Sequence, residues 1–389
     1  MKIPLKYIIR NLLTRRTTSL LTVTGVTLVV FVFTAVLMQA HGLQKTLIAT
    51  GSDDNVIVLR KSADAEITSI IAREQADIIT SMAEVARAPD GRAFASKEIV
   101  VVINQEYADR SGLSNLTVRG VSPEAFAIRP QVKLDRGRLF NWGSREVIVG
   151  AAAARKFRGM APGDQIKFGG DEWTIVGTFD AGGTGFDSEV WGDVEQLGQA
   201  FQRPVFSTVS FRLTQTDAFK DFVSAMEKDN RLQSLEAKRE KQFYADQSEA
   251  LATFIRVMGI AVTVIFSLGA MIGAMITMYG AVANRTVEIG TLRSLGFRRR
   301  SVLAAFVVES ISISFAGWVL GVALASFLQF FSISMLNFQS FSELAFGFSL
   351  SIPIILISLT FALLMGVCGG FLPAVRAARL NILEALRAS

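Results

Sequence analysis

Residues 284–302 read NRTVEIGTLRSLGFRRRSV, and they lie between two long apolar segments of the chain. This stretch combines a cluster of arginines with one glutamate and two glycines. Charged residues between segments suited to lipid predict a loop at one surface of a membrane. The rest of the sequence must then show which surface the loop occupies and what it contacts there.

Composition supports a membrane protein with an inserted soluble domain. The chain has 389 residues, of which 50% are hydrophobic, and its mean hydropathy is +0.39. Residues 41–250 have ordinary polarity, whereas both flanks hold nearly uninterrupted apolar runs. The net charge of +6 comes from basic residues that gather at the ends of these runs, not from one patch interleaved with aromatic residues. We therefore expect membrane lipid, and no nucleic acid, among the partners.

The chain contains apolar segments long enough to cross a membrane as helices, a task that takes about 20 residues. The first is uncharged and has no small-residue cleavage site behind it, so it is interpreted as a retained signal anchor. Pro353 would occupy the first turn of the last helix, where its missing N–H costs little. The four predicted spans are residues 17–40, 251–283, 301–335 and 351–372.

Basic residues near the span ends predict the orientation. They are frequent in residues 1–16, in the loop 284–300 and in the tail 373–389, and they are absent from the short link 336–350. Both termini and the 284–300 loop are therefore expected in the cytoplasm. Residues 41–250 and the link are expected outside it.

The outer domain of about 210 residues has a mixed α and β pattern and enough length for a packed core. Helical spacing of apolar residues predicts helices in 62–82 and 217–229. Strand patterns occur at 98–105, 115–121, 145–150 and 207–213, and 165–179 predicts a hairpin that turns at Gly169-Gly170-Asp171. The Gly-rich stretch 177–191 has no Gly-Lys-Ser/Thr and is expected to be an exposed loop.

Two helices are expected to extend beyond the lipid. No Gly or Pro interrupts residues 237–258, where the chain passes from charged to apolar, so one helix is expected to rise there into the outer domain. Residues 41–50 are expected to extend the first span outward in the same way. Such extensions would couple tilts of the spans to the outer domain.

The 284–302 stretch also has a helical pattern of its own. Ile289, Leu292 and Leu295 lie on one stripe, but Glu288 falls on the same side, so the segment is not a lipid-surface amphipathic helix. A short helix with mixed chemistry suits a contact between protein surfaces. Gly296 would end it because glycine tolerates positive φ.

These residues resemble a known family. EIGTLRSLGFRRRSV, followed by an apolar span containing Glu309, is similar to the loop of FtsX-like ABC transporter permeases of the MacB type. The tail PAVRAARLNILEALRAS and the residues Arg-Asn-Leu-Leu at 10–13 resemble the same family's ending and its amphipathic opening helix, although Ile382 stands where members often have proline. The resemblance implies that the loop is a coupling helix that docks on an ATPase through Glu288, Ile289, Gly290, Leu292, Arg293, Leu295 and Gly296.

The outer domain carries the resemblance further. VRGVSPEAF, LDRGRLF, REVIVGAAAARKF, APGDQIKFGG and WTIVGTF follow the order of the MacB-type periplasmic core. The implied fold class is a membrane protein of four transmembrane α-helices with a large α+β extracytoplasmic domain between helices 1 and 2. That domain would consist of a porter-like part built from both of its ends and a small β-rich insertion near residues 120–200.

The resemblance implies the permease subunit of an ABC transporter in the inner membrane, most simply one that drives efflux by mechanotransmission. Because no G-x-x-x-x-G-K-[ST] motif occurs, ATP hydrolysis and its Mg²⁺ are expected on a separate ATPase subunit, with no cofactor bound by this chain. A homodimer is implied, with a periplasmic adaptor and an outer-membrane channel as further partners. The alternatives are LolC-like extraction of lipoproteins or lipids, and FtsX-like regulation of cell-wall hydrolases.

The remaining candidate residues have structural interpretations. Glu309 is an ionisable group near the end of a span, and we expect it to pair with Arg300 in preference to serving a proton relay. Gly269 with Gly273, and Gly317 with Gly321, have spacings that permit close helix packing, either within the chain or in a dimer. His41 is the only histidine and Cys368 the only cysteine, so neither a catalytic triad nor a metal centre is expected.

Overall fold

A computed structural model describes residues 16–337 and 341–381. The predicted amphipathic segment before residue 16, and Ile382 with the rest of the tail, lie outside the described residues. The chain forms two compact units. The helical unit contains the described residues up to His41, Thr253–Phe331 and those from Phe348 onward, and the sheet unit contains Gly42–Ala252 and Ser332–Gly347.

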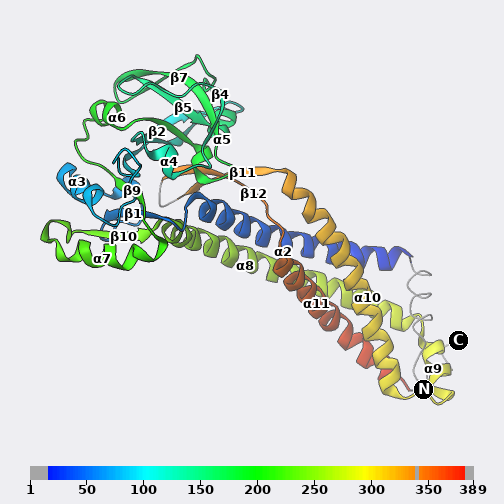
Figure 1. Ribbon diagram of the computed structural model, residues 1–389. Coiled ribbons are helices and arrows are strands. Elements are labelled where there is room, and N and C mark those ends of the chain that lie inside the picture. The colour runs from blue at the N-terminus through cyan, green and yellow to red at the C-terminus, as the bar shows by residue number, and fades with distance from the viewer. Residues whose placement is uncertain (1–15, 338–340, 382–389) are drawn as a thin grey trace. The chain divides into compact units, whose positions relative to one another are not determined.

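The helical unit is built on long apolar helices (Figure 1). Each contains an 18-residue window with a mean hydropathy between 2.0 and 2.5, and by length and composition each could cross a membrane. A short helix, α9 (Thr286–Ser294), connects the second to the third. Within the described residues, the four long helices are α2 (Arg16–Thr50), α8 (Glu240–Ala283), α10 (Arg299–Ser326) and α11 (Ile352–Arg379).

Small residues let α10 and α11 pack closely. The Ser310 hydroxyl donates to the carbonyl oxygen of Gly366 at 2.6 Å, and a Cβ on Gly370 would lie 2.4 Å from the Ser310 Cβ. Trp318 Nε1 also donates to the Ser358 hydroxyl at 3.1 Å. α11 begins with Pro353 in its first turn, as predicted, and it continues through Pro373 to Arg379, seven residues beyond the predicted span end at Leu372.

The sheet unit contains one long mixed sheet. In the order β10-β1-β9-β2-β3-β8-β5-β7-β4, only β3–β8 and β5–β7 are parallel, and β6 pairs with β7. Its strands are β1 (Asn55–Arg60), β2 (Ala95–Glu106), β3 (Leu113–Val121), β4 (Lys133–Gly137), β5 (Glu146–Gly150), β6 (Gln165–Phe168), β7 (Asp171–Asp180), β8 (Glu189–Asp193), β9 (Thr208–Arg212) and β10 (Leu235–Arg239).

Two hydrophobic cores divide this sheet. The first core is drawn from both ends of the domain and contains Ile79, Phe211 and Phe222, while the second contains Val147, Trp173 and Leu197. The long strand β2 joins them, because its first residues pair with β9 and its last with β3. The two-part domain predicted from the sequence is thus present, but one continuous sheet runs through both parts.

Short helices cover the two cores. α3 and α7 contribute buried residues to the first core, α5 contributes to the second, and α6 contributes Val194 to the first and Leu197 to the second. The short α-helices are α3 (Arg73–Ser81), α4 (Ala125–Ile128), α5 (Ala151–Lys156), α6 (Val194–Ala200) and α7 (Phe219–Lys228), and the 3₁₀ turns are η1 (Glu66–Thr68), η2 (Gly185–Ser188), η3 (Thr216–Ala218), η4 (Asn230–Leu232) and η5 (Phe327–Phe330).

Tertiary contacts override several local patterns. The helix predicted over 62–82 forms only at Arg73–Ser81, because the Glu66 carboxylate is bound by Arg119 and the Ser69 hydroxyl accepts from the Arg60 N–H at 2.9 Å. The predicted exposed loop at 177–191 is instead packed, with Phe186 fully buried. The predicted β6–β7 hairpin does form, and Gly169 and Gly170 turn it with positive φ.

The third predicted span ends earlier than residue 335. α10 stops at Ser326, and the chain then forms a hairpin of β11 (Ser332–Asn337) and β12 (Ser342–Gly347) that belongs to the sheet unit. The described part of the predicted link 336–350 therefore contains regular structure, in Leu336–Asn337 and Ser342–Gly347. The alternation in SISMLN and SELAFG is the period-2 signal that marks these strands.

The start of α8 is held inside the sheet unit. Residues 237–239, predicted as helix, complete β10, and α8 begins at Glu240, which is fully buried. Gly51, directly after α2, lies so close to Lys241 that an added Cβ would be 2.5 Å from its backbone nitrogen. α2 and α8 each contribute residues to both units, and within the sheet unit the end of one contacts the start of the other.

A buried cluster of charges ties Glu240 to the sheet. Arg129 donates to Glu240 at 3.0 Å and contacts Glu98, which also accepts from Arg119 at 2.7 Å. Arg119 completes two further pairs at 2.7 Å, with Glu66 and Glu189. The six side chains come from β2, β3, β8, η1, α8 and the residue after α4, so the cluster fixes separate elements in one geometry.

Two carboxylates of this cluster have pKa values shifted in different directions. Burial by itself would raise the pKa of Glu98, but Arg129 and Arg119 outweigh it and leave that pKa lowered. Burial dominates at Glu189, whose pKa is raised despite Arg119. Glu98 is therefore the carboxylate that both arginines stabilise as an anion. In the sequence, this cluster is indicated only by an arginine in the middle of the otherwise uncharged strand LTVRGV.

Replacing Arg129 with methionine should destabilise the sheet unit by about 3–5 kcal/mol, because breaking a buried ion pair leaves charge uncompensated. Denaturant unfolding of the full chain in detergent, followed by tryptophan fluorescence, to which the buried Trp173 and Trp191 of the sheet unit contribute, measures the change. Arg136→Met is the matched control, since the Arg136 side chain is 79% exposed. Equal unfolding midpoints for the two variants would contradict a structural role for the cluster.

Candidate functional site

The short helix α9 lies between α8 and α10 and carries the predicted coupling residues. Arg285 precedes its first turn, and Glu288 in that turn is an acidic residue that favours the helix N-terminus. Gly296 follows it with φ of +92°, a conformation suited to glycine, as predicted. The helix therefore has a defined beginning and end within a loop of the helical unit.

A buried ion pair anchors the start of α9 to α10. Arg285 Nη1 lies 3.0 Å from Glu309 Oε2, and both side chains are 9% exposed. Arg285 Nε also lies 3.2 Å from Glu288 Oε2, and its guanidinium is 5.0 Å from the centre of the Phe306 ring. One arginine thus connects the first turn of α9 to two residues on α10.

The arginine that pairs with Glu309 differs from the predicted one. Arg300 is exposed and precedes Glu309 by nine residues on the same helix, a rise of about 13.5 Å that side chains do not span. Arg285, 24 residues away in sequence, reaches Glu309 because the chain reverses through α9. The expected structural ion pair is present, with this correction of its partner.

The end of α9 is anchored to α11. Arg293 Nη1 donates to the carbonyl oxygens of Leu380 at 2.7 Å and Ala378 at 3.4 Å, beside the C-terminus of α11. A cation at this position also interacts favourably with the negative end of the helix dipole. α9 is therefore attached to α10 by its first turn and to α11 by its last.

Apolar packing completes the attachment. Ile289 is 2% exposed and lies in a cluster with Val302 and Phe306 of α10 and with Ala374 and Ala377 of α11. Gly290 is buried beside it. One side of α9 is thus a fixed part of the helical unit.

The opposite side of α9 is exposed. Val287 in α9 is 41% exposed, and Leu295, the C-cap residue directly after α9, is 66% exposed, which are large values for apolar side chains. Residues at positions 287, 288, 291, 294 and 295 recur at helical spacing, so they form one stripe. This stripe combines apolar, acidic and hydroxyl side chains: Val287, Glu288, Thr291, Ser294 and Leu295.

The structure divides the predicted coupling residues into three groups. Ile289 and Gly290 are buried in the anchor, Leu292 and Arg293 are half-buried, and only Glu288, Leu295 and Gly296 are exposed. The predicted stripe of Ile289, Leu292 and Leu295 therefore runs from the buried to the exposed side. Val287, Thr291 and Ser294 were not predicted, although their i, i+4, i+7 spacing was readable from the sequence.

The two predicted glycine pairs have different environments. A Cβ on Gly317 would lie 2.8 Å from Val26 Cγ1, and one on Gly321 would lie 2.9 Å from the Thr27 carbonyl oxygen, so both pack against α2. Gly269 and Gly273 on α8 have no atom within 4 Å of such a position. The first pair forms a seam within the chain, and the second lies on an open helix face.

Arrangements that could hold a metal are absent from the described residues 16–337 and 341–381, where groups of three or more His, Cys, Asp or Glu with suitable geometry do not occur. Cys368 is exposed on α11. α9 itself has one anchored side and one exposed side.

Comparison with known families matches both parts of the chain. The family model described as "MacB-like periplasmic core domain" matches residues 19–229, and the one described as "FtsX-like permease C-terminal" matches residues 260–382. The second match includes α9, α10 and α11.

Individual relatives show the same similarity. An uncharacterized ABC transporter permease of Bacillus subtilis, YknZ, is 27% identical over 291 residues, which cover 70% of each chain. The macrolide export ATP-binding/permease protein MacB of Bdellovibrio bacteriovorus is 26% identical over 70% of this chain but only 44% of its own length. The chain thus spans less than half of that relative.

Among solved structures, the periplasmic region of MacB from Actinobacillus actinomycetemcomitans is similar over 51% of this chain and 94% of its own, with 10% identity and a TM-score of 0.39.

Replacing Arg285 with methionine should loosen α9. Removing one partner of a buried pair costs about 3 kcal/mol, so amide exchange in α9 should rise by roughly two orders of magnitude. Hydrogen–deuterium exchange of the full chain in detergent measures this. Arg300→Met, which changes an exposed arginine in the first turn of α10, should leave α9 protected, and equal exchange in the two variants would rule out the Arg285 anchor.

Proposed function

The chain belongs to the family of ABC transporter permeases that combine a MacB-like periplasmic core domain with an FtsX-like C-terminal region, and we propose that a separate ATPase subunit binds it through α9. The observation that carries this proposal is the two-sided character of α9. Its buried side is fixed to α10 and α11 by Arg285, Ile289 and Arg293, while its exposed stripe has the mixed chemistry of a protein interface.

The anchored side determines what binding would do. Because the side chains of Arg285 and Glu309 are buried, separating them would cost more free energy than separating an exposed ion pair. A displacement of α9 by a bound subunit would therefore pass to α10 and α11 as a rigid movement instead of being absorbed by a flexible loop. This is the mechanical property that a coupling helix needs.

The distribution of basic residues supports placing α9 on the cytoplasmic side. Arg298, Arg299 and Arg300 follow α9, whereas residues 327–351, at the other end of α10 and α11, contain neither Lys nor Arg. By the positive-inside rule, α9 and both termini face the cytoplasm of the cell that carries this protein in its cytoplasmic membrane. ATP is available on that side.

ATP hydrolysis belongs to the partner subunit in this proposal. The sequence has no G-x-x-x-x-G-K-[ST] motif with which to hold the phosphates and Mg²⁺, so this chain would be the non-catalytic subunit. ATP-driven closure of two ATPase subunits would displace α9. α2 and α8, which have residues in both units, would carry the movement to the extracytoplasmic domain.

The resulting activity would be export by movement of the extracytoplasmic domain. The junction of α8 with the sheet supports such transmission, because Glu240 is held by Arg129 at 3.0 Å and by Asn55 at 2.9 Å with no exposed surface. The first residue of α8 could not shift without moving β1 and the ion cluster. The MacB relatives are named for macrolide export, and we extend export, without a named substrate, to this chain.

A homodimer would provide two such permease subunits. On α8, the exposed positions Gly269, Gly273 and Gly280 would let a second copy approach closely, and a Cβ at each meets no atom within 4 Å. Gly317 and Gly321, in contrast, already pack against α2 within the same chain. α8 is therefore the helix that we place at the dimer interface.

Replacing Leu295 with aspartate should abolish the ATPase contact. Leu295, the C-cap residue of α9, is more exposed than any large apolar residue within α9, and a charge there would be buried without a partner in the complex. We expect loss of the co-purifying ATPase and a fall of about tenfold or more in ATP turnover. Leu139→Asp, at a 44% exposed leucine of the extracytoplasmic domain, is the control and should keep both. An ATPase that remains bound and active in Leu295→Asp would contradict the proposal.

The proposed dimer contact can be tested by cross-linking. In a Cys368→Ser background, Gly273→Cys should form a covalent dimer in membranes treated with a mild oxidant, because α8 of each copy would meet at this face. Leu364→Cys, at a position 59% exposed on α11, should not. A monomer at Gly273→Cys under conditions that dimerise Leu364→Cys would assign the interface to another helix.

A further inference from the structure

The β11–β12 hairpin is covalently joined to α10 at one end and leads to α11 at the other, yet it belongs to the sheet unit. A two-stranded hairpin is marginally stable alone, so packing must support it. Leu344 and Phe346 are 7% and 3% exposed, the Ala345 N–H donates to the Ser188 hydroxyl at 3.0 Å, and Asn115 Nδ2 donates to the Phe341 carbonyl oxygen at 2.5 Å. The hairpin is therefore docked on the extracytoplasmic domain.

One carboxylate gathers the polar contacts of this docking. The Glu343 side chain is 10% exposed, and it contacts the ammonium of Lys156 and the hydroxyls of Tyr107 and Ser114. Lys156 also contacts the Ser334 hydroxyl on the other strand of the hairpin. Lys156 ends α5, Tyr107 follows β2 and Ser114 lies on β3, so Glu343 binds the hairpin to three parts of the sheet unit.

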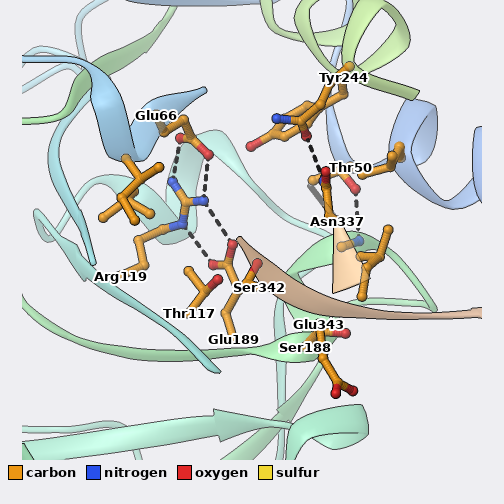
Figure 2. A pocket seen from close by; sticks show the side chains of 16 residues that line it. Thr50, Glu66, Thr117, Arg119, Ser188, Glu189, Tyr244, Asn337, Ser342 and Glu343 are labelled. Atoms are coloured by element: carbon orange, nitrogen blue, oxygen red, sulfur yellow. Dashed lines mark hydrogen bonds and ion pairs between the residues drawn. The ribbon is translucent and has the colours of Figure 1, made fainter. Parts of the chain in front are cut away.

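The docked hairpin also covers the buried ion cluster. A cavity of about 50 Å³ lies between them, and the hairpin contributes Asn337, Ser342 and Glu343 to its wall (Figure 2). Leu344 also lines it. Arg119 and Glu189 of the cluster line the same cavity. Asn337 Nδ2 donates to Gln247 Oε1 of α8 at 3.5 Å, so the hairpin contacts α8 as well as the sheet.

We propose that Glu343 is a positioning residue that keeps this hairpin docked, and that the docked hairpin is a third mechanical link from the membrane helices to the extracytoplasmic domain, beside α2 and α8. The inference rests on the proposed function. α9 is anchored to α10 and α11, and these two helices are the ones that the hairpin joins. Movement of α9 therefore reaches the sheet unit through α10, α11 and Glu343.

The link predicts a particular behaviour of the hairpin. A loop that merely connects α10 to α11 could leave the domain without consequence, whereas a mechanical link must stay docked while it transmits movement. Covalent fixation of the hairpin would then be tolerated, and release would uncouple the two ends of the protein. Fixation should also compensate for the loss of Glu343.

The experiment uses the full chain with its co-purifying ATPase in nanodiscs, all variants being made in the Cys368→Ser background. Spin labels on exposed positions of the sheet unit report the change in interlabel distances of the dimer on addition of ATP and Mg²⁺. Glu343→Ala should reduce the amplitude of this change by about fivefold or more, the low end of common coupling factors. Glu106→Ala, at a carboxylate whose side chain is 61% exposed, is the control and should retain it.

A disulfide between Ser188→Cys and Ala345→Cys should restore the ATP-dependent change in Glu343→Ala, since these residues adjoin across the docking contact. Restoration separates a positioning role from a general loss of folding. Tyr107→Phe, which removes one hydroxyl, should give an intermediate amplitude and serves if Glu343→Ala does not fold.

Three results would overturn the inference: a full response in Glu343→Ala, a disulfide that forms without restoring the response, or a disulfide that does not form in the presence of Glu343. If the protein with Glu343 intact shows no ATP-dependent change, the proposed function fails instead. The two failures are therefore distinguishable.

Discussion

The buried pair of Arg285 and Glu309 is the interaction on which the position of α9 in the helical unit depends. The guanidinium of Arg285, from the connection between α8 and α10, pairs with the buried carboxylate of Glu309 on α10. Without a partner, a buried carboxylate at this position would be costly. Because Arg285 also holds Glu288, the direction of α9 is fixed from its first turn. The exposed stripe of α9 is presented in one orientation for that reason.

The sheet unit uses the same principle at the start of α8. Glu240 belongs to a cluster in which Arg119 and Arg129 hold carboxylates from separate strands, and each arginine is also stacked near the Phe186 ring. Buried pairs of this kind add little net stability but penalise any geometry that separates them. In the sheet unit, the charge cluster holds the start of α8 rigidly. In the helical unit, the Arg285–Glu309 pair holds α9 rigidly to α10. Rigid attachments at both places suit the transmission of movement.

The sequence predicted what depends on local composition and failed where distant residues decide. Apolar runs identified all four long helices, and the two-part domain and the α9 region were predicted from motif order and resemblance. The predicted partner of Glu309, Arg300, was wrong because the sequence does not show that the chain reverses through α9 and brings Arg285 to α10. Glu66 was predicted in a helix but lies in a 3₁₀ turn, where it binds Arg119. Residues 332–335 were predicted in a membrane span but form part of β11. Long-range packing outweighs local preference at both places.

The central claim is that an ATPase subunit contacts the exposed stripe of α9. A photo-reactive amino acid placed at Leu295, followed by illumination of intact cells, tests it directly because cross-linking captures whatever lies within a few ångströms of that side chain. The account predicts a covalent product between this chain and a nucleotide-binding subunit, and none when the probe replaces the buried Ile289. Products at Leu295 that contain only lipid or an extracytoplasmic protein would contradict it.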